Sequence, residues 1–133
     1  SSFVDQVRVF ARCALLLGVV GAGLTNMLFM PPAGVVMVLQ PVGMREDFAA
    51  MAAGCGHYAV PVFVACTRDV QVLTEFREYE NASARWCTQL VPCKLRYIAM
   101  CEVEVDLDAF LPVFGAALSY AFRFRLQGPL ILR

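Results

Sequence analysis

A glycine-rich turn near the N-terminus is the part of this sequence best suited to chemistry. An apolar run, Ala14–Val20, has the composition of a buried strand, and Gly21-Ala22-Gly23-Leu24-Thr25 follows it directly. Glycine has no Cβ, so the chain can turn sharply at Gly21 and Gly23 and a ligand can approach the main chain. A helix that begins after the turn would direct unpaired N–H groups and the positive end of its dipole at an anion. The pattern predicts a phosphate site, although tight packing of a strand against a helix also selects glycine.

Alternating strand and helix patterns surround this turn. Apolar and amphipathic runs predict three strands, at residues 14–20, 35–39 and 58–66, and three helices, at residues 2–12, 24–30 and 45–53. Ser1 or Ser2 is the expected N-cap of the first helix. This order of elements is typical of a parallel sheet covered by helices, which binds ligands at the carboxyl ends of its strands. The sequence therefore predicts one α/β domain over residues 1–133.

The second half of the chain has a weaker pattern. We expect a helix over residues 69–79, a strand over 96–105 and a helix from about 108 to 120, capped by Asp106 or Asp108. Acidic residues alternate with valines along the 96–105 segment, which is typical of a solvated strand face rather than a metal site. His57, the only histidine, stands just before a predicted strand, where a structural role is more common than catalysis.

The cysteines do not have the spacing of a metal site. No C-x-x-C pair is present, and a zinc site would need ligands that a single histidine does not supply. Three cysteines in apolar contexts are expected to be core residues, and three later ones are close enough for one local disulfide, which the sequence leaves open. In chain order these are Cys13, Cys55, Cys66, Cys87, Cys93 and Cys101. We therefore expect no bound metal.

Composition narrows the class of partner. The chain is 59% apolar and 17% charged, whereas globular chains are roughly 45–50% apolar and about 25% charged. The net charge is zero and no basic stripe is present, so nucleic-acid binding is not expected. The excess apolar surface predicts a protein interface or a position beside a membrane. Residues 13–44 carry no charge and are long enough to span a bilayer, but Pro31, Pro32 and the glycine turn favour a buried strand–helix–strand unit.

Two segments, Ser2-Phe3-Val4-Asp5-Gln6-Val7 and Gly21-Ala22-Gly23-Leu24-Thr25-Asn26-Met27-Leu28-Phe29-Met30-Pro31-Pro32, resemble the C-terminal half of family 61 glycosyltransferases. These include plant xylosyl- and arabinosyltransferases and animal O-linked N-acetylglucosaminyltransferases. Segments 48–58 and 103–118 look like continuations of the pattern. The resemblance implies a Rossmann-like parallel sheet with helices on both faces, one half of a GT-B-type fold. It also implies that Gly21, Ala22, Gly23, Leu24 and Thr25 face the diphosphate of a nucleotide-sugar donor.

The sequence departs from that family in two ways. The family typically has histidine directly before Gly-Ala-Gly, where this chain has Val20, and the chain corresponds to only one of the two domains. These departures predict a non-catalytic domain, without catalytic residues or cofactor, that binds other protein subunits as an accessory or scaffold subunit. The alternative is the donor-binding half of an active glycosyltransferase, with a nucleotide-sugar as its donor. A third interpretation is a membrane anchor spanning Cys13–Met30.

The two main interpretations predict different compartments. A repurposed domain is expected in a mitochondrial or plastid complex, and an active transferase in the Golgi or endoplasmic reticulum lumen. The chain begins at Ser1 without an initiator methionine, which a cleaved transit peptide would explain. The sequence does not identify the assembly or the sugar.

Overall fold

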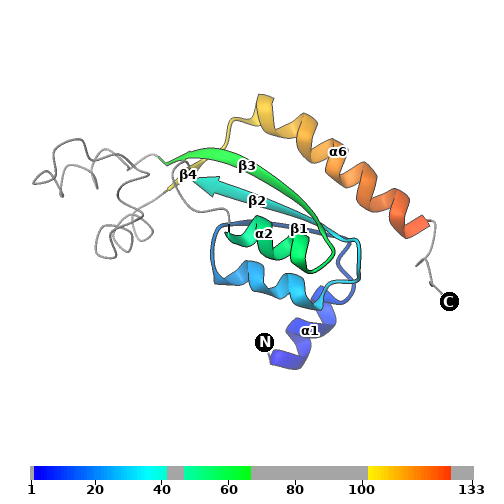
Figure 1. The fold of residues 1–133 in the computed structure, drawn as a ribbon. Coiled ribbons are helices and arrows are strands. Elements are labelled where there is room, and N and C mark those ends of the chain that lie inside the picture. The colour runs from blue at the N-terminus through cyan, green and yellow to red at the C-terminus, as the bar shows by residue number, and fades with distance from the viewer. Residues whose placement is uncertain (1, 42–46, 67–101, 127–133) are drawn as a thin grey trace, which may run out of the picture.

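The computed structural model describes residues 2–41, 47–66 and 102–126 (Figure 1), with side chains up to Arg123 in the last segment. Several predictions lie outside these residues. They are the helix over 69–79, most of the strand over 96–105, and the pairing of Cys87, Cys93 and Cys101.

Four strands form one mixed sheet in the order β1-β2-β3-β4. The strands β1 (Leu15–Val19), β2 (Val35–Pro41) and β3 (Tyr58–Cys66) are parallel, as expected, whereas β4 (Val103–Glu104) is antiparallel to β3. Thus the α/β class is confirmed, and the three strands from which a parallel sheet was expected are parallel; the direction of the last strand was not predicted. Val103 pairs with Cys66, the last residue of β3. A strand that enters the sheet beside the end of its neighbour must run back in the opposite direction.

Helices cover both faces of the sheet, as expected (Figure 1). The 3₁₀ helix η1 (Ala22–Phe29) and the helix α2 (Asp47–Gly54) lie on one face, and α6 (Leu107–Leu126) lies on the other. Central strand β2 serves both layers, because successive side chains of a strand point to opposite faces. Val36 and Val38 pack in the cluster under η1 and α2, while Val35 and Met37 pack under α6. A strand covered on both faces buries the side chains of both, which explains the hydrophobic run over residues 35–39 that precedes Gln40.

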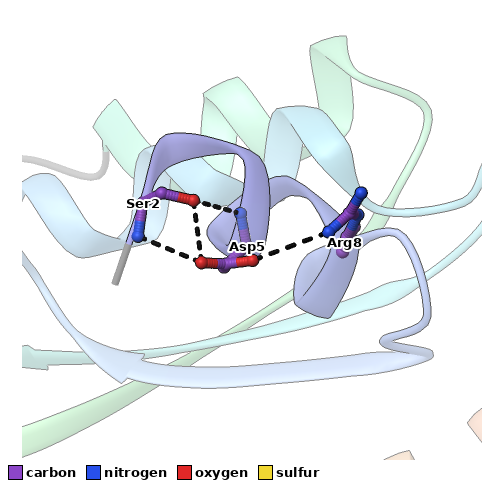
Figure 2. A network of polar contacts seen from close by, with 3 residues as sticks. All are labelled: Ser2, Asp5 and Arg8. Atoms are coloured by element: carbon purple, nitrogen blue, oxygen red, sulfur yellow. Dashed lines mark hydrogen bonds and ion pairs between the residues drawn. The ribbon is translucent and has the colours of Figure 1, made fainter.

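The first helix, α1 (Phe3–Phe10), is capped and docked by its own N-terminal residues. Ser2 is the N-cap: its Oγ accepts from the Asp5 N–H at 3.2 Å, and its own N–H donates to the Asp5 carboxylate at 3.2 Å. Figure 2 shows this reciprocal pair, together with an ion pair of 3.7 Å between Asp5 and Arg8. The Phe3 ring meets the Phe29 ring edge-on, with centroids 5.6 Å apart, so α1 is attached to the end of η1.

The helices differ from the sequence expectation in their bounds; α1, for example, covers Phe3–Phe10 rather than residues 2–12. The helix after the glycine turn begins at Ala22, two residues before the predicted start, and is a 3₁₀ helix. Helix α6 extends to Leu126, beyond the predicted end near residue 120, and Pro112 lies within it. Of the two candidate caps, Asp106 is the one used, since its Oδ1 accepts from the N–H groups of Asp108 (3.0 Å) and Ala109 (3.3 Å). Among the described residues, no helix combines the length and the apolar character needed to cross a membrane.

Candidate functional site

The glycine turn lies at the carboxyl end of β1, as the sequence predicts. Beyond the last strand residue, the Val20 N–H donates to the Leu39 carbonyl at 3.0 Å and holds the chain beside β2. The Leu24 N–H then donates to the Gly21 carbonyl at 3.0 Å and closes the first turn of η1. Parallel sheets bind their ligands at this edge. The turn itself therefore consists of Val20 and Gly21, and residues 22–25 already belong to the helix.

Two other glycines, Gly18 and Gly34, lie in close contact with side chains of the η1 layer. A Cβ on Gly18 would lie 2.9 Å from Cδ2 of Leu24, and a Cβ on Gly34 would lie 2.8 Å from Cε of Met30. Both distances are shorter than van der Waals contact, so the side chains of Leu24 in η1 and of Met30, just after it, would have to shift to accommodate alanine.

Gly21 and Gly23 are different, because no packing constraint within the described residues explains them. A Cβ on Gly21 would meet only the Val19 carbonyl oxygen, at an ordinary 3.8 Å, and a Cβ on Gly23 would meet no described atom within 4 Å. The Gly21 φ of 166° is extended backbone, which any residue adopts. These two positions therefore leave the main chain at the start of η1 open to approach from outside.

The other residues of the predicted site hold the turn in shape. Leu24 is only 2% exposed and belongs to the core cluster under η1. The Thr25 hydroxyl donates to the Ala22 carbonyl at 2.6 Å, and the Asn26 side-chain amide donates to the Gly23 carbonyl at 3.0 Å. A helix leaves its first N–H groups without an intrahelical partner. The groups that can meet a ligand are therefore the main-chain N–H groups at the start of η1, which suit an anion and supply no proton-transfer chemistry.

Val20, which stands where a histidine was expected from the resemblance, faces the interior. Its side chain is half-buried and packs against the core cluster formed by residues of η1, β2 and α2. An aliphatic side chain in this place stabilises η1 on the sheet and offers no hydrogen bond to a ligand.

His57 lies away from the turn and has a structural position. It is 7% exposed, and its Nε2 is 2.9 Å from the Met27 carbonyl oxygen. Since a carbonyl oxygen only accepts, Nε2 carries the proton and donates, and Nδ1 is the buried nitrogen with no hydrogen-bond partner among the described residues. The histidine thereby connects the end of η1 to the start of β3. This agrees with the structural role that its position in the sequence indicated.

The described residues contain no cluster of three or more potential metal ligands. Cys13 and Cys55 are free, half-buried thiols, and the Cys13 Sγ lies 3.4 Å from the Val9 carbonyl oxygen. Sequence reasoning did not single out Gly18 or Gly34, or the fully buried Gln40 at the end of β2. A lone polar residue at the end of an apolar strand could have identified Gln40, but no local signal separates a packing glycine from an open one.

Comparison with known proteins supports the resemblance inferred from sequence. The Glycosyltransferase 61 family matches residues 1–37, which contain α1, β1, η1 and the first residues of β2. The matched segment includes the whole glycine turn, so the suspected relation to this family is confirmed where the candidate site lies. No curated protein and no solved structure gives a significant match.

Proposed function

We propose that this chain, related to the Glycosyltransferase 61 family through residues 1–37, binds the diphosphate of a nucleotide-sugar at Gly21, Ala22 and Gly23. The main support for the proposal is that some glycines are tightly packed and others are open. Gly18 and Gly34 lie close against the side chains of the η1 layer, whereas Gly21 and Gly23 meet nothing in the described structure that would exclude a side chain. Glycine at two open positions beside a helix N-terminus is what close approach of a phosphate requires.

The physical basis is main-chain recognition. The helix η1 begins at Ala22, so its first N–H groups and the positive end of its dipole lie at the turn. The bonds from Thr25 and Asn26 to the carbonyls of Ala22 and Gly23 fix the orientation of these peptide groups before a ligand arrives. A site that is rigid before binding loses less entropy on binding. The anion is therefore recognised by backbone geometry, and Leu24 and Thr25 contribute by support.

A second candidate is the non-catalytic accessory subunit expected from the sequence, and Val20 is the observation that favours it. A position expected to carry histidine instead completes the apolar core under η1. Large apolar side chains of the edge strand β1 are also exposed, with Leu17 at 38% and Val19 at 45%. An apolar sheet edge suits another protein subunit that presents an apolar surface. In this case the relation to glycosyltransferases is one of descent, and no donor binds.

Calorimetric titration of the purified chain with UDP-xylose and UDP-N-acetylglucosamine separates the two candidates. Gly54 is a matched control, because a Cβ there also meets no described atom within 4 Å, yet it ends α2 rather than forming the turn. If the turn binds the donor, Gly23→Ala weakens binding by at least about tenfold and Gly54→Ala leaves it unchanged. If the folded chain binds neither compound up to about 1 mM, the donor proposal fails and the accessory-subunit candidate stands.

A further inference from the structure

Helix α6 has an outward side that the rest of the described chain does not cover. Its inner side packs on the sheet through the buried residues Ala117 and Ala121, with Phe110 and Phe114 beside them. In Figure 1 no other coloured element lies beyond α6 on the outer side. Large apolar side chains are exposed along one flank of the helix, about a quarter turn from the sheet-facing residues, with Leu107 at 60%, Leu111 at 55% and Phe122 at 57%.

These side chains follow helical spacing and form one stripe. Residues that recur every three or four positions lie on one side of a helix. We define the α6 stripe as Leu107, Leu111, Gly115, Leu118 and Phe122, all within α6. An apolar stripe of this length can pack against a second helix. The large residues of the two helices then interlock on either side of the point where the helices come closest.

Gly115 supplies that point of close approach. It lies inside a helix of 20 residues, where glycine destabilises the helix relative to alanine. A Cβ at this position would meet no described atom within 4 Å, so packing on the sheet does not explain the glycine. A second helix crossing at Gly115 could approach the backbone more closely than any side chain would permit.

The charges at the two ends of α6 indicate what the second helix is. Exposed acidic residues surround the start of the helix, at Glu104, Asp106 and Asp108, and the exposed Arg123 lies near its end. Gly115 is equidistant in sequence from Leu107 and Arg123. An antiparallel copy centred on Gly115 therefore places the acidic start of each helix beside Arg123 of the second copy, and it also opposes the two helix dipoles favourably. An anionic membrane surface fits less well, because carboxylates flank the stripe.

We propose that two copies of this chain associate through the α6 stripe, with their α6 helices antiparallel and crossing at Gly115. The arrangement is isologous, since the same surface serves both copies, so it closes as a dimer and does not extend into a filament. It uses the face of the sheet opposite η1. It therefore goes beyond the proposed donor binding, and failure of either proposal leaves the other intact.

Sedimentation of the 133-residue chain over a range of concentrations tests the dimer. The expected result is a reversible equilibrium between the 14.6 kDa chain and a species of twice that mass. Leu111→Glu on the stripe is expected to raise the dimer dissociation constant at least about tenfold. Ala109→Glu adds the same charge to the same helix, at an exposed position on the other side, and is expected to leave the constant unchanged.

Charge reversal gives a second measurement that loss of folding cannot imitate. Arg123→Glu should weaken the dimer, and combining it with Asp108→Arg should restore association, because the opposite charges face each other again. Circular dichroism confirms that each variant is folded. The proposal is overturned by a chain that remains monomeric at all concentrations. It is also overturned by a dimer that Leu111→Glu and Ala109→Glu affect equally, or by a double charge reversal that restores nothing.

Discussion

The helices on the two faces of the sheet pack against it through different side chains. Under η1, Met27, Val36 and Val38 are fully buried. The side chains of Leu24 and Met30 lie against Gly18 and Gly34. Under α6 the sheet is contacted by two buried alanines, Ala117 and Ala121, and by the half-buried rings of Phe110 and Phe114. Large residues on one flank of α6 remain exposed.

The small residues have different surroundings on the two faces of the sheet. On the η1 face Gly18 and Gly34 lie close against side chains. Gly21 and Gly23 at the turn, and Gly54 at the end of α2, are open within the described residues. On the α6 face the small residues that touch the sheet are alanines, and the glycine of the helix, Gly115, meets nothing in the described structure. Exposed apolar side chains lie in both layers, with Leu28 of η1 at 60% and Leu111 of α6 at 55%. Among the described helices, only α6 combines them with an open glycine near the middle of a long helix.

The largest expected effect is the removal of a core side chain on the η1 face. Met27 is 0% exposed and Leu111 of α6 is 55% exposed. Met27→Ala leaves a cavity and should lower the free energy of unfolding by roughly 2–5 kcal/mol. Leu111→Ala should change it by less than about 0.5 kcal/mol, when measured at concentrations where the chain is monomeric. Urea unfolding of the two variants measures both changes in the free energy of unfolding. Equal losses would show that Leu111 is packed as tightly as Met27, which would contradict the comparison.

Two glycine-to-alanine changes should shift stability in opposite directions. Gly18→Ala places a Cβ 2.9 Å from Cδ2 of the buried Leu24, and the resulting overpacking should cost about 1–3 kcal/mol. Gly115→Ala enters open space and removes a helix-destabilising residue, so it should stabilise the monomer by about 0.5–1 kcal/mol. Thermal unfolding of dilute protein measures both. Destabilisation by Gly115→Ala would mean that an internal neighbour contacts this position.

Much of the fold could be predicted from local patterns. Strand β3 has the predicted bounds, Ser2 and Asp106 are caps as expected, and the glycine turn lies at the carboxyl edge of the sheet. The antiparallel β4 could not be predicted, because strand direction depends on where the chain re-enters the sheet. The sequence also could not show that Gly18 is packed against a side chain while Gly21 is open. That difference depends on the distance from each glycine to Leu24 after folding. The burial of Leu24, which narrows the site to main-chain groups, depends on the same packing.

The smallest expected effect concerns the edge where α6 meets β3. The rings of Tyr58 and Tyr120 lie with centroids 4.7 Å apart and planes at 66°. The hydrogen bond that the Tyr120 hydroxyl donates to Tyr58 raises the pKa of Tyr120 from 10.0 to about 12, helped by partial removal from water and by the charge of Tyr58. A raised pKa means that the folded state favours the protonated phenol. The stabilisation is therefore complete below about pH 10 and is lost as the pH rises toward 12.

Alkaline pH should then loosen the α6 face before the η1 face, because neither η1 nor α2 contains a tyrosine. Ultraviolet absorbance of phenolate should show a late-titrating tyrosine in the natural chain. Tyr58→Phe should remove that late titration, since the phenylalanine ring preserves the edge-on contact and accepts no hydrogen bond. Hydrogen exchange between about pH 10 and 12 should rise first in α6. If exchange rises first in η1, or if Tyr58→Phe leaves the titration unchanged, then the tyrosine pair does not hold α6 to the sheet. In that case the buried alanines and phenylalanines alone would account for the attachment of this helix.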